Sequence, residues 1–597
     1  MAIQTVCDLF YRSVDSYRKP EHLKYKRDGA WRAVSSEELR AAVEEIAMGL
    51  RALGVSRGDK VAIISENRPE WAFADFATLC TGAADATIYP TLTAAQVLYI
   101  LDDSESKVVF VSNAAQAAKV GEVRARLPRL QHVVCFDPDP VPGTTSLDGL
   151  RAKGREALAA DRDAVRRQAT TLTKDDLATL IYTSGTTGDP KGVMLTHGNL
   201  LHNVLAAQKV FPMVGPEWTA LSFLPLCHSF ERTAGHNFML HAGVTIAYAE
   251  SVEKVPENMG EVRPHIMCSV PRLYEKMYAR VNEKVASDPP LRQRIFRWAI
   301  GVGGRVFAHT VARTEPGALL KLQFALADRL VFSKIKARTG GRLQLFISGG
   351  APLAREIAEF FGAAGMLVCE GYGLTETSPV ITCNYPGRVK PGTVGLPLEH
   401  VEVKIAEDTE ILTRGPHVMK GYYRKPEATA EAIDGDGWFH TGDIGFVDAE
   451  GCLVITDRKK DIIVTSGGKN IAPQPIENRL KTNRFFTEVV MVGNKRNFPA
   501  ALVVPNFESL EAWARQGGMS VVSREELVRR PEVLAHYRRL VDEMTADLAQ
   551  FEKIKKIALL TREFTQESGE LTPTLKVKRR VVEERYKPTI DAMYEGS

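Results

Sequence analysis

Short apolar runs alternate with amphipathic segments through most of the chain. The runs at 60–65, 108–112, 177–182 and 343–348 are bounded by polar or turn residues and have the length of buried strands. Between such runs, segments like 36–53 place apolar residues at helical spacing. This alternation is typical of α/β proteins whose helices cover largely buried sheets. We therefore predict an α/β fold with a large N-terminal domain of stacked sheets.

The pattern changes after about residue 401. Strand-like runs become shorter there, and the turns between them are rich in glycine and aspartate, as at 434–437 and 450–451. We interpret residues of about 395–456 as a small β-rich subdomain that closes an N-terminal domain spanning 1–458.

A charged cluster at 457–461 interrupts two strand-like runs and marks a predicted domain boundary. Beyond it, apolar runs again alternate with helical segments. This pattern predicts a smaller, compact α+β domain over residues 461–597.

Two segments between residues 291 and 338 are both basic and amphipathic. In 291–306, several arginines surround Ile295, Phe296, Trp298 and Ile300. In 319–338, four leucines fall on one helical stripe, namely Leu319, Leu322, Leu326 and Leu330. A basic amphipathic helix can lie on a membrane surface, but we favour the alternative that these segments pack in a core or line a tunnel.

The composition excludes several classes of protein. Among 597 residues, 44% are apolar, 25% are charged and the formal charge is only +4, which is not the strong basic excess of a nucleic-acid-binding protein. The eight cysteines show neither CxxC nor zinc spacing, so we expect free thiols in a reducing compartment.

The N-terminus lacks an apolar signal segment, and the uncharged runs are too short to span a bilayer. We expect a cytoplasmic protein.

The most specific local motif is the run YTSGTTGDPKG at 182–192, which follows an apolar run. Its glycines allow close approach of the backbone to a ligand, and its hydroxyls and backbone N–H groups can surround phosphate oxygens. Lys191 adds a positive charge. The run does not fit a Walker A loop, and the alternative is a polar hairpin loop.

Two further clusters are less specific. In the run 371–377, Tyr372 can stack on a base, Thr375 can bond a phosphate and Glu376 can hold Mg²⁺. Asp443 can accept hydrogen bonds from both hydroxyls of a ribose. These residue types are also common in solvated turns, so neither cluster alone establishes a role.

Taken together and in this order, the motifs resemble the adenylate-forming superfamily of acyl-CoA synthetases, peptide-synthetase adenylation domains and beetle luciferases. The resemblance extends from about residue 30 to 580. The matching runs are YTSGTTGDPKG at 182–192, ISGGAPL at 347–353, GYGLTET at 371–377, HTGD at 440–443, DRKKDIIVTSGGKNI at 457–471 and TPTLKVKR at 572–579.

The resemblance implies that these residues bind ATP and Mg²⁺ and activate a carboxylic acid. The glycine-rich loop would hold the pyrophosphate end of ATP, and Glu376 would be the metal ligand. Adenine would be bordered by Gly349, Gly350, Ala351 and Tyr372, the ribose by Asp443 and Arg458, and the α-phosphate by Thr375 and Glu376. The implied ATP-binding set is Thr183, Ser184, Gly185, Thr186, Thr187, Gly188, Lys191, Gly349, Gly350, Ala351, Tyr372, Gly373, Thr375, Asp443 and Arg458.

A lysine near the C-terminus would act on the carboxylate and α-phosphate, beside Lys191, Thr375 and Glu376. By motif register this lysine is Lys576. Leu575 stands where many family members have glycine, and Lys578 lies close enough to be a rival. The resemblance also implies that the C-terminal domain is mobile, with a hinge at Lys460. A CoA-side loop would consist of Ser466, Gly467, Gly468 and Lys469.

The run 269–276 and the helical insertion that follows it to about 338 resemble the long-chain fatty acyl-CoA synthetases. His228 matches a substrate-site residue of the family, with a satisfied core histidine as the alternative. The leading hypothesis is activation of a long-chain fatty acid to acyl-AMP and its transfer to CoA.

Two other functions stay open. The first is an acyl-AMP ligase that passes the acyl group to a carrier protein, and the second is an inactive fatty-acid-binding or uptake protein. The expected partners are a fatty acid, ATP and CoA, with no nucleic acid. Peripheral contact of 291–338 with the inner face of a membrane is the open alternative noted above.

Overall fold

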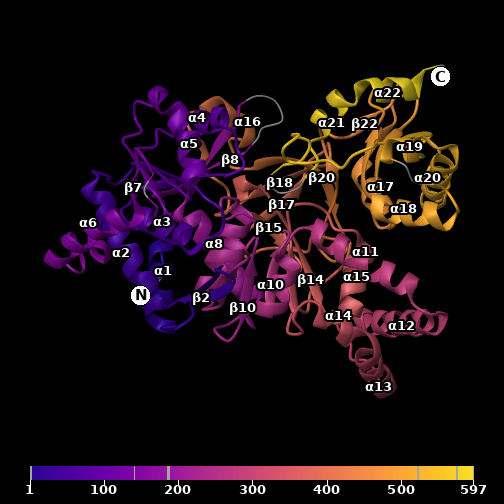
Figure 1. The fold of residues 1–597 in the computed structure, drawn as a ribbon, viewed down its shortest axis with the longest axis horizontal. Helices are drawn as coiled ribbons and strands as arrows, with labels where there is room; N and C mark the ends of the chain where they lie inside the picture. The colour runs from indigo at the N-terminus through magenta and orange to yellow at the C-terminus, as the bar shows by residue number, and fades with distance from the viewer. Residues whose placement is uncertain (1–2, 140, 184–188, 521–522, 573–575, 596–597) are drawn as a thin grey trace.

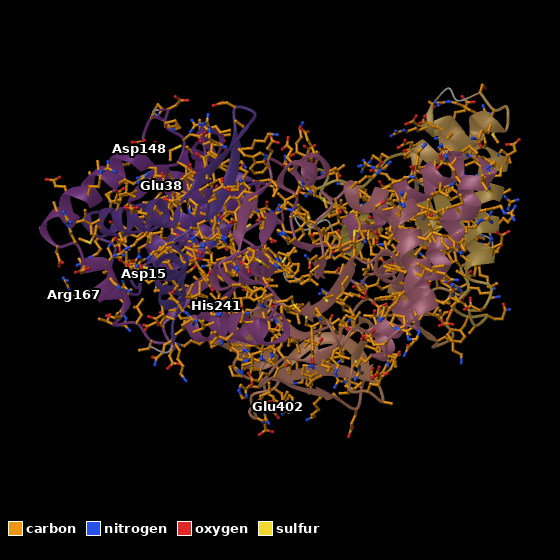
Figure 2. The ribbon with its side chains drawn as sticks, turned by 90° about the horizontal axis from the view of Figure 1, so that it is seen from below. Asp15, Glu38, Asp148, Arg167, His241 and Glu402 are labelled. Carbon is orange, nitrogen blue, oxygen red and sulfur yellow. The ribbon has the colours of Figure 1, made fainter. Side chains whose placement is uncertain are left out.

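The computed structural model describes residues 3–139, 141–183, 189–520, 523–572 and 576–595. Two large sheets and their helices form the N-terminal body, and the C-terminal residues form a smaller lobe beside it (Figure 1). Charged side chains such as Asp148, Arg167 and Glu402 lie exposed at the periphery (Figure 2). The predicted α/β class is confirmed.

The first sheet has eight strands within the described residues, in the order β19-β9-β8-β4-β3-β5-β6-β7. The predicted strands at 60–65, 108–112 and 177–182 are β3, β5 and β8. The strands of this first sheet are β3 Lys60–Ile64, β4 Ala84–Ile88, β5 Val108–Val111, β6 His132–Cys135, β7 Thr145–Ser146, β8 Leu177–Thr183, β9 Lys191–Thr196 and β19 Gly421–Tyr422.

Both faces of this sheet are buried, which explains its continuous apolar runs. Val61 and Ile63 pack against one set of helices, whereas Ala62 and Ile64 pack against another, because successive side chains of a strand alternate between faces. The first set is α1 Val6–Tyr17, α2 Ser36–Ala52, α3 Pro69–Cys80, α6 Leu147–Ala160 and α7 Ala164–Ala169, and the second is α4 Ala94–Asp103 and α5 Ala114–Val123.

Helix α2 shows how local sequence sets these elements. Ser35 accepts a hydrogen bond from the Glu38 N–H at 3.1 Å, and Glu38 accepts one from the Ser35 N–H at 2.7 Å. This reciprocal cap begins the helix, and its apolar stripe is buried.

The second sheet has nine strands among the described residues, in the order β16-β15-β14-β13-β12-β10-β11-β1-β2. Its centre is parallel, so the carboxyl ends of β12, β13 and β14 meet at one edge. The strands are β1 Leu23–Arg27, β2 Ala30–Val34, β10 Thr219–Ser222, β11 Thr245–Tyr248, β12 Ile266–Ser269, β13 Leu345–Ser348, β14 Leu367–Gly373, β15 Val380–Cys383 and β16 Leu396–Pro397.

The largest hydrophobic core contains residues of both sheets and of three helical elements. These are helix α8 (His197–Val210), the π-helix η2 (Glu231–Asn237) and helix α9 (Phe238–His241), which continues η2. Every residue of η2 is buried, including Arg232. The Arg232 guanidinium donates to both oxygens of Asp85 on β4, at 2.9 and 2.6 Å, and to the Thr179 hydroxyl on β8 at 2.7 Å. It also pairs with Asp75 on α3. This cluster attaches the π-helix to the eight-stranded sheet.

The β-rich subdomain is a four-stranded antiparallel sheet of β17 Glu402–Ile405, β18 Glu410–Arg414, β20 Phe439–Val447 and β21 Leu453–Arg458, as the described residues show it. Strand β21 therefore continues through Asp457 and Arg458 of the charged cluster, and only the rest of that cluster forms the break.

The C-terminal lobe contains a two-stranded and a three-stranded sheet with helices around them. The strands are β22 Ile463–Val464, β23 Asn470–Ile471, β24 Phe486–Val492, β25 Ala500–Pro505 and β26 Lys556–Leu559. The helices are α17 Pro473–Lys481, α18 Phe507–Gln516, α19 Arg524–Arg529, α20 Pro531–Met544, α21 Arg579–Arg585 and α22 Lys587–Tyr594.

The insertion after β12 projects from the body (Figure 1). It consists of α11 Pro271–Ser287, α12 Pro290–Ala312, α13 Ala318–Ala327, the π-helix η3 Asp328–Phe332 and α14 Ser333–Ala337. The four leucines of the predicted stripe are 41–70% exposed. Core packing or a tunnel wall is therefore wrong for this stripe, because another face of the same helical segment, with Phe324 and Phe332, turns inward.

The Arg232 cluster gives a stability prediction. Arg232→Met leaves buried carboxylates without their cation, so the free energy of unfolding falls by about 3–5 kcal/mol in urea denaturation followed by tryptophan fluorescence. The matched control is Arg355→Met, since Arg355 pairs with Glu359 on the exposed surface of α15 (Arg355–Ala363). Its cost is below about 1 kcal/mol. Equal costs would contradict a supporting role of Arg232.

Candidate functional site

A cavity of about 720 Å³ lies where the two sheets, the β-rich subdomain and the C-terminal lobe meet. It collects residues that are far apart in sequence, among them Lys191, Glu376, Asp443 and Lys576. Most of the predicted site residues within the described ranges line it.

One wall of the cavity is built on the β8–β9 hairpin. Thr183 and Lys191 are cross-strand partners at its end, and both line the cavity. The predicted residues Ser184, Gly185, Thr186, Thr187 and Gly188 lie outside the described residues. The Lys191 ammonium lies 4.9 Å from the centre of the Tyr422 ring, and the Tyr422 hydroxyl donates to Glu376 Oε1 at 2.9 Å.

Thr375 and Glu376 lie in a short 3₁₀ turn, η4 (Thr375–Thr377), directly after β14. Burial raises the pKa of Glu376, and hydrogen bonding, including that from Tyr422, opposes the shift. The Thr375 hydroxyl lies 3.4 Å from that of Ser229.

Glu376 is a suitable partner for a magnesium ion carried by a nucleotide. No group of three or more His, Cys, Asp or Glu side chains able to hold a metal occurs among the described residues. Mg²⁺ commonly binds through one or two carboxylates together with substrate phosphates, and the carboxylate of Glu376, which lines the cavity, fits that mode.

Asp443 and Arg458 are cross-strand partners on β20 and β21, so sheet register brings them together. Asp443 accepts a hydrogen bond from the Tyr372 hydroxyl at 2.8 Å and lies 3.2 Å from Arg458 Nε. Burial raises the pKa of Asp443 and Arg458 opposes that shift. Tyr372 thus orients the carboxylate as well as lining the cavity.

Four glycines form part of the cavity wall. Gly349, Gly350, Gly371 and Gly373 line the cavity. Gly350 has φ +85°, and a Cβ on Gly373 would lie 1.6 Å from the Pro379 carbonyl oxygen, so neither position accepts a side chain without strain. Ala351 is exposed and does not line the cavity, so its place at the adenine border stays a prediction.

Lys576 reaches the cavity from the C-terminal lobe. Its N–H donates to the Thr572 hydroxyl at 3.0 Å, and the Thr572 N–H donates back to its carbonyl at 2.8 Å. Burial, assisted by Arg458, lowers the pKa of Lys576 to about 8, against the attraction of Asp443. Lys578 caps α21 and does not line the cavity, so the geometry favours Lys576 over its rival.

An apolar lobe extends from the polar part of the cavity. His228 lies between the two, and burial, then the charge of Lys576, lowers its pKa to about 3, so it is neutral. It borders the cavity and its Nδ1 accepts the Phe230 N–H at 3.2 Å. The apolar lining consists of Ala207, Val210, Phe211, Phe230, Ala234, Phe238, Val380, Cys383 and Leu398.

The predicted CoA-side residues are not part of this cavity. Ser466, Gly467, Gly468 and Lys469 form the turn between β22 and β23 and are exposed. Lys460, the predicted hinge, does line the cavity, next to Arg458 and Lys459.

Sequence reasoning missed Tyr422, Ser229 and the apolar lobe. Tyr422 lies on a two-residue strand that pairs with β9, more than two hundred residues earlier, and nothing in its local sequence indicates that pairing. The apolar lobe comes from α8, η2 and α9, whose apolar residues look like ordinary core.

Comparison with known proteins shows two family matches. Residues 10–423 match the AMP-binding enzyme model, and residues 460–597 match the AMP-binding enzyme C-terminal domain. The chain is 38% identical over 580 residues to long-chain-fatty-acid–CoA ligase FadD15 of Mycobacterium bovis, covering 96% of this chain and 95% of that protein. It is 33% identical over 620 residues to the peroxisomal long chain acyl-CoA synthetase 7 of Arabidopsis thaliana, covering 99% and 86%.

Solved structures share the fold. The adenylation domain of a carboxylate reductase from Mycobacterium chelonae has a TM-score of 0.76 at 23% identity, covering 99% of this chain and 91% of that one. The anthranilate CoA ligase AuaEII, solved with anthranoyl-AMP, has a TM-score of 0.74 at 19% identity, covering 99% of both chains.

The Tyr422–Glu376 contact gives a testable prediction. Tyr422→Phe removes a donor to the buried carboxylate, and a hydrogen bond to a charged group contributes roughly 1.5–3 kcal/mol. We expect affinity for magnesium–ATP to fall about tenfold or more, measured by isothermal titration calorimetry.

Tyr423→Phe is the matched control. Its hydroxyl donates to Glu105 at 3.0 Å, and Tyr423 does not line the cavity. This variant keeps wild-type affinity, and a loss as large as that of Tyr422→Phe would disprove the specific role of Tyr422.

Proposed function

This chain belongs to the AMP-binding enzyme family, and we propose that it is a long-chain fatty acid–CoA ligase that uses ATP and releases AMP and pyrophosphate. The observation that supports this most directly is the meeting of Lys191, Glu376 and Lys576 in one cavity with an apolar lobe. The acidic and basic groups suit a nucleotide and a carboxylate, and the apolar lobe suits an alkyl chain.

The first half-reaction joins the fatty acid to AMP. A carboxylate is a poor acyl donor, and attack on the α-phosphate of ATP converts it to a mixed anhydride with pyrophosphate as the leaving group. Negative charge accumulates on oxygens in this step, and Lys576 and Lys191 stabilise it from fixed positions. Bound Mg²⁺, which Glu376 would hold, neutralises phosphate charge.

Residues at the polar end orient the substrates. Asp443 would accept the ribose hydroxyls, with its carboxylate held by Tyr372 and Arg458. Neutral His228, at the junction of the two parts, would position the carboxylate without adding charge. Thr183 and Lys191 would meet the outer phosphates.

The second half-reaction transfers the acyl group to the CoA thiolate, with AMP leaving. We propose that the C-terminal lobe rotates about Lys460 for this step, which withdraws Lys576 and brings Ser466–Lys469 to the acyl-adenylate. Contacts between Arg272 on α11 and the C-terminal lobe, at 2.7 Å to the Thr487 carbonyl and 2.9 Å to Glu488, would have to break.

We also propose a cytoplasmic location with peripheral contact of residues 291–338 at the inner face of a membrane. The eight cysteines are all free and buried, which suits a reducing compartment. In the described part of the chain, no helix is long and apolar enough to cross a bilayer.

The role of Lys576 gives the main test. Lys576→Ala abolishes formation of acyl-AMP, because the cation that stabilises the transferring phosphoryl group is lost, yet pre-made acyl-adenylate still reacts with CoA. Single-turnover kinetics of each half-reaction measures this. Lys578→Ala is the matched control and keeps both rates. Equal loss of both half-reactions in folded Lys576→Ala would contradict the two-position account.

The pKa of Lys576 predicts a pH dependence. Because burial disfavours the ammonium form, Lys576 in the free enzyme loses its proton near pH 8. We expect kcat/KM for adenylation to fall as the pH rises through about 8, and Lys576→Arg to lack this decline.

The apolar lobe predicts chain-length selectivity. Each buried methylene contributes about 0.8 kcal/mol, so kcat/KM rises from octanoate to palmitate in a CoA-dependent AMP-release assay. Ala234→Phe fills part of the lobe and lowers kcat/KM for palmitate more than for octanoate. An optimum at acetate, or equal losses for both acids, would reject the long-chain assignment.

A further inference from the structure

Helix α13 is apolar on both faces, and the folded chain covers only one of them. Leu320, Phe324 and Ala327 pack into a hydrophobic core that also contains Phe332, Phe346 and Phe361. Leu319, Leu322 and Leu326 are 70%, 69% and 50% exposed. A helix that is apolar all round is normally enclosed by protein or lipid. The outer face of α13 therefore requires a covering that the chain itself does not provide.

Exposed apolar side chains also lie outside α13. Leu330 in η3 is 41% exposed and completes what we call the leucine stripe: Leu319, Leu322, Leu326 and Leu330. On the neighbouring α12, Leu291 and Trp298 are also exposed. Among the described residues, six of the thirteen exposed large apolar side chains thus lie between 291 and 330. Figure 1 shows α12 and α13 projecting from the lower edge of the body, with α13 pointing away from the C-terminal lobe.

The net charge of residues 291–338 indicates what kind of surface covers the exposed leucines. Residues 291–338 contain ten lysines and arginines and two acidic residues, a formal charge of +8, while the whole chain carries +4. The rest of the chain is therefore net negative, at −4. Arg329, Lys334 and Arg338 flank the stripe, are exposed, and form no ion pair with any described residue. Their long side chains can place their charges at a lipid phosphate layer while the leucines enter the apolar boundary.

A second copy of this chain does not suit the surface. A symmetric dimer through the stripe would oppose two segments of +8, and like charges across an interface are unfavourable. An anionic bilayer supplies both an apolar interior and negative charge.

We propose that residues 291–338 form a docking surface for an anionic lipid bilayer, with the leucine stripe inserted at the headgroup–acyl boundary. The surface lies in the interface rather than spanning it, since no described helix can cross a bilayer. This names the partner of the peripheral contact in the proposed function and rests on that function for its purpose, which is access to acids that partition into lipid. Docking itself needs no catalysis.

Vesicle co-sedimentation of the full-length protein tests the apolar part. We expect the wild type to bind vesicles of phosphatidylcholine mixed with phosphatidylglycerol, and to bind phosphatidylcholine alone far more weakly. Leu319→Ser/Leu322→Ser/Leu326→Ser lowers the affinity about tenfold or more. Leu534→Ser, at a residue 42% exposed on α20, is the matched control and binds like the wild type.

Two triple variants test the role of the positive charges. Arg329→Gln/Lys334→Gln/Arg338→Gln loses most of the preference for phosphatidylglycerol, and added salt has the same effect on the wild type. Arg27→Gln/Arg32→Gln/Arg162→Gln removes as many exposed charges elsewhere and keeps the preference.

Two results would overturn the proposal. One is wild-type binding that is absent or unaffected by the leucine substitutions. The other is a wild-type dimer, seen by sedimentation velocity, that the leucine substitutions dissociate, since a second copy would then be the covering. AMP release with octanoate in the absence of vesicles stays at the wild-type rate in every variant, so failure of docking and failure of the proposed ligase activity are distinguished.

Discussion

Burial of Arg232 is the constraint on which the site depends. A guanidinium in the core between two sheets is tolerated only with carboxylates around it, and Asp75 and Asp85 supply them. The negative charge of two carboxylates exceeds the positive charge of one guanidinium. Burial raises the pKa of Asp75, and the nearby charge of Asp85 raises it further. The same cluster includes Thr179 on β8, the strand that ends at the phosphate side of the cavity, while the residues after Arg232 form the wall of the apolar lobe. The Arg232 cluster thus holds strand β8 and the wall of the apolar lobe in a fixed position relative to each other.

Burial in the cavity shifts the pKa values of acids and of bases in opposite directions for a single reason. Burial raises the pKa values of Glu376 and Asp443 and lowers those of Lys576 and His228. In each case desolvation disfavours the charged form. Negative charge on a nucleotide or a carboxylate offsets this cost for Lys576, whereas the cost for Glu376 and Asp443 is offset by cations and hydrogen-bond donors. Tyr372 and Tyr422 hold the two carboxylates through hydroxyl donors, which fixes their orientation before any ligand is present.

Much of the fold is readable from local sequence because its signals are local. The apolar runs at 60–65 and 177–182 are recognisable as strands because both faces of their sheet are covered, so most positions in them are apolar. The glycine-rich run at 182–192 and the Thr375–Glu376 pair were identifiable because close backbone approach and charge leave a distinctive residue pattern. Motif register did not reveal that Ala351 is exposed while Gly349 and Gly350 line the cavity.

The sequence by itself determined the α/β class, the order of the motifs and the residue types of the polar site. Only the tertiary structure decided which of these residues meet. Tyr422 acquires its role from a two-residue strand pairing across more than two hundred residues, and Lys576 from the docking of the C-terminal lobe. The leucines of α13 look the same in sequence whether they face a core or solvent, because a helical stripe fixes which residues share a face and not what that face meets. Long-range packing makes that choice, and here it left the stripe uncovered.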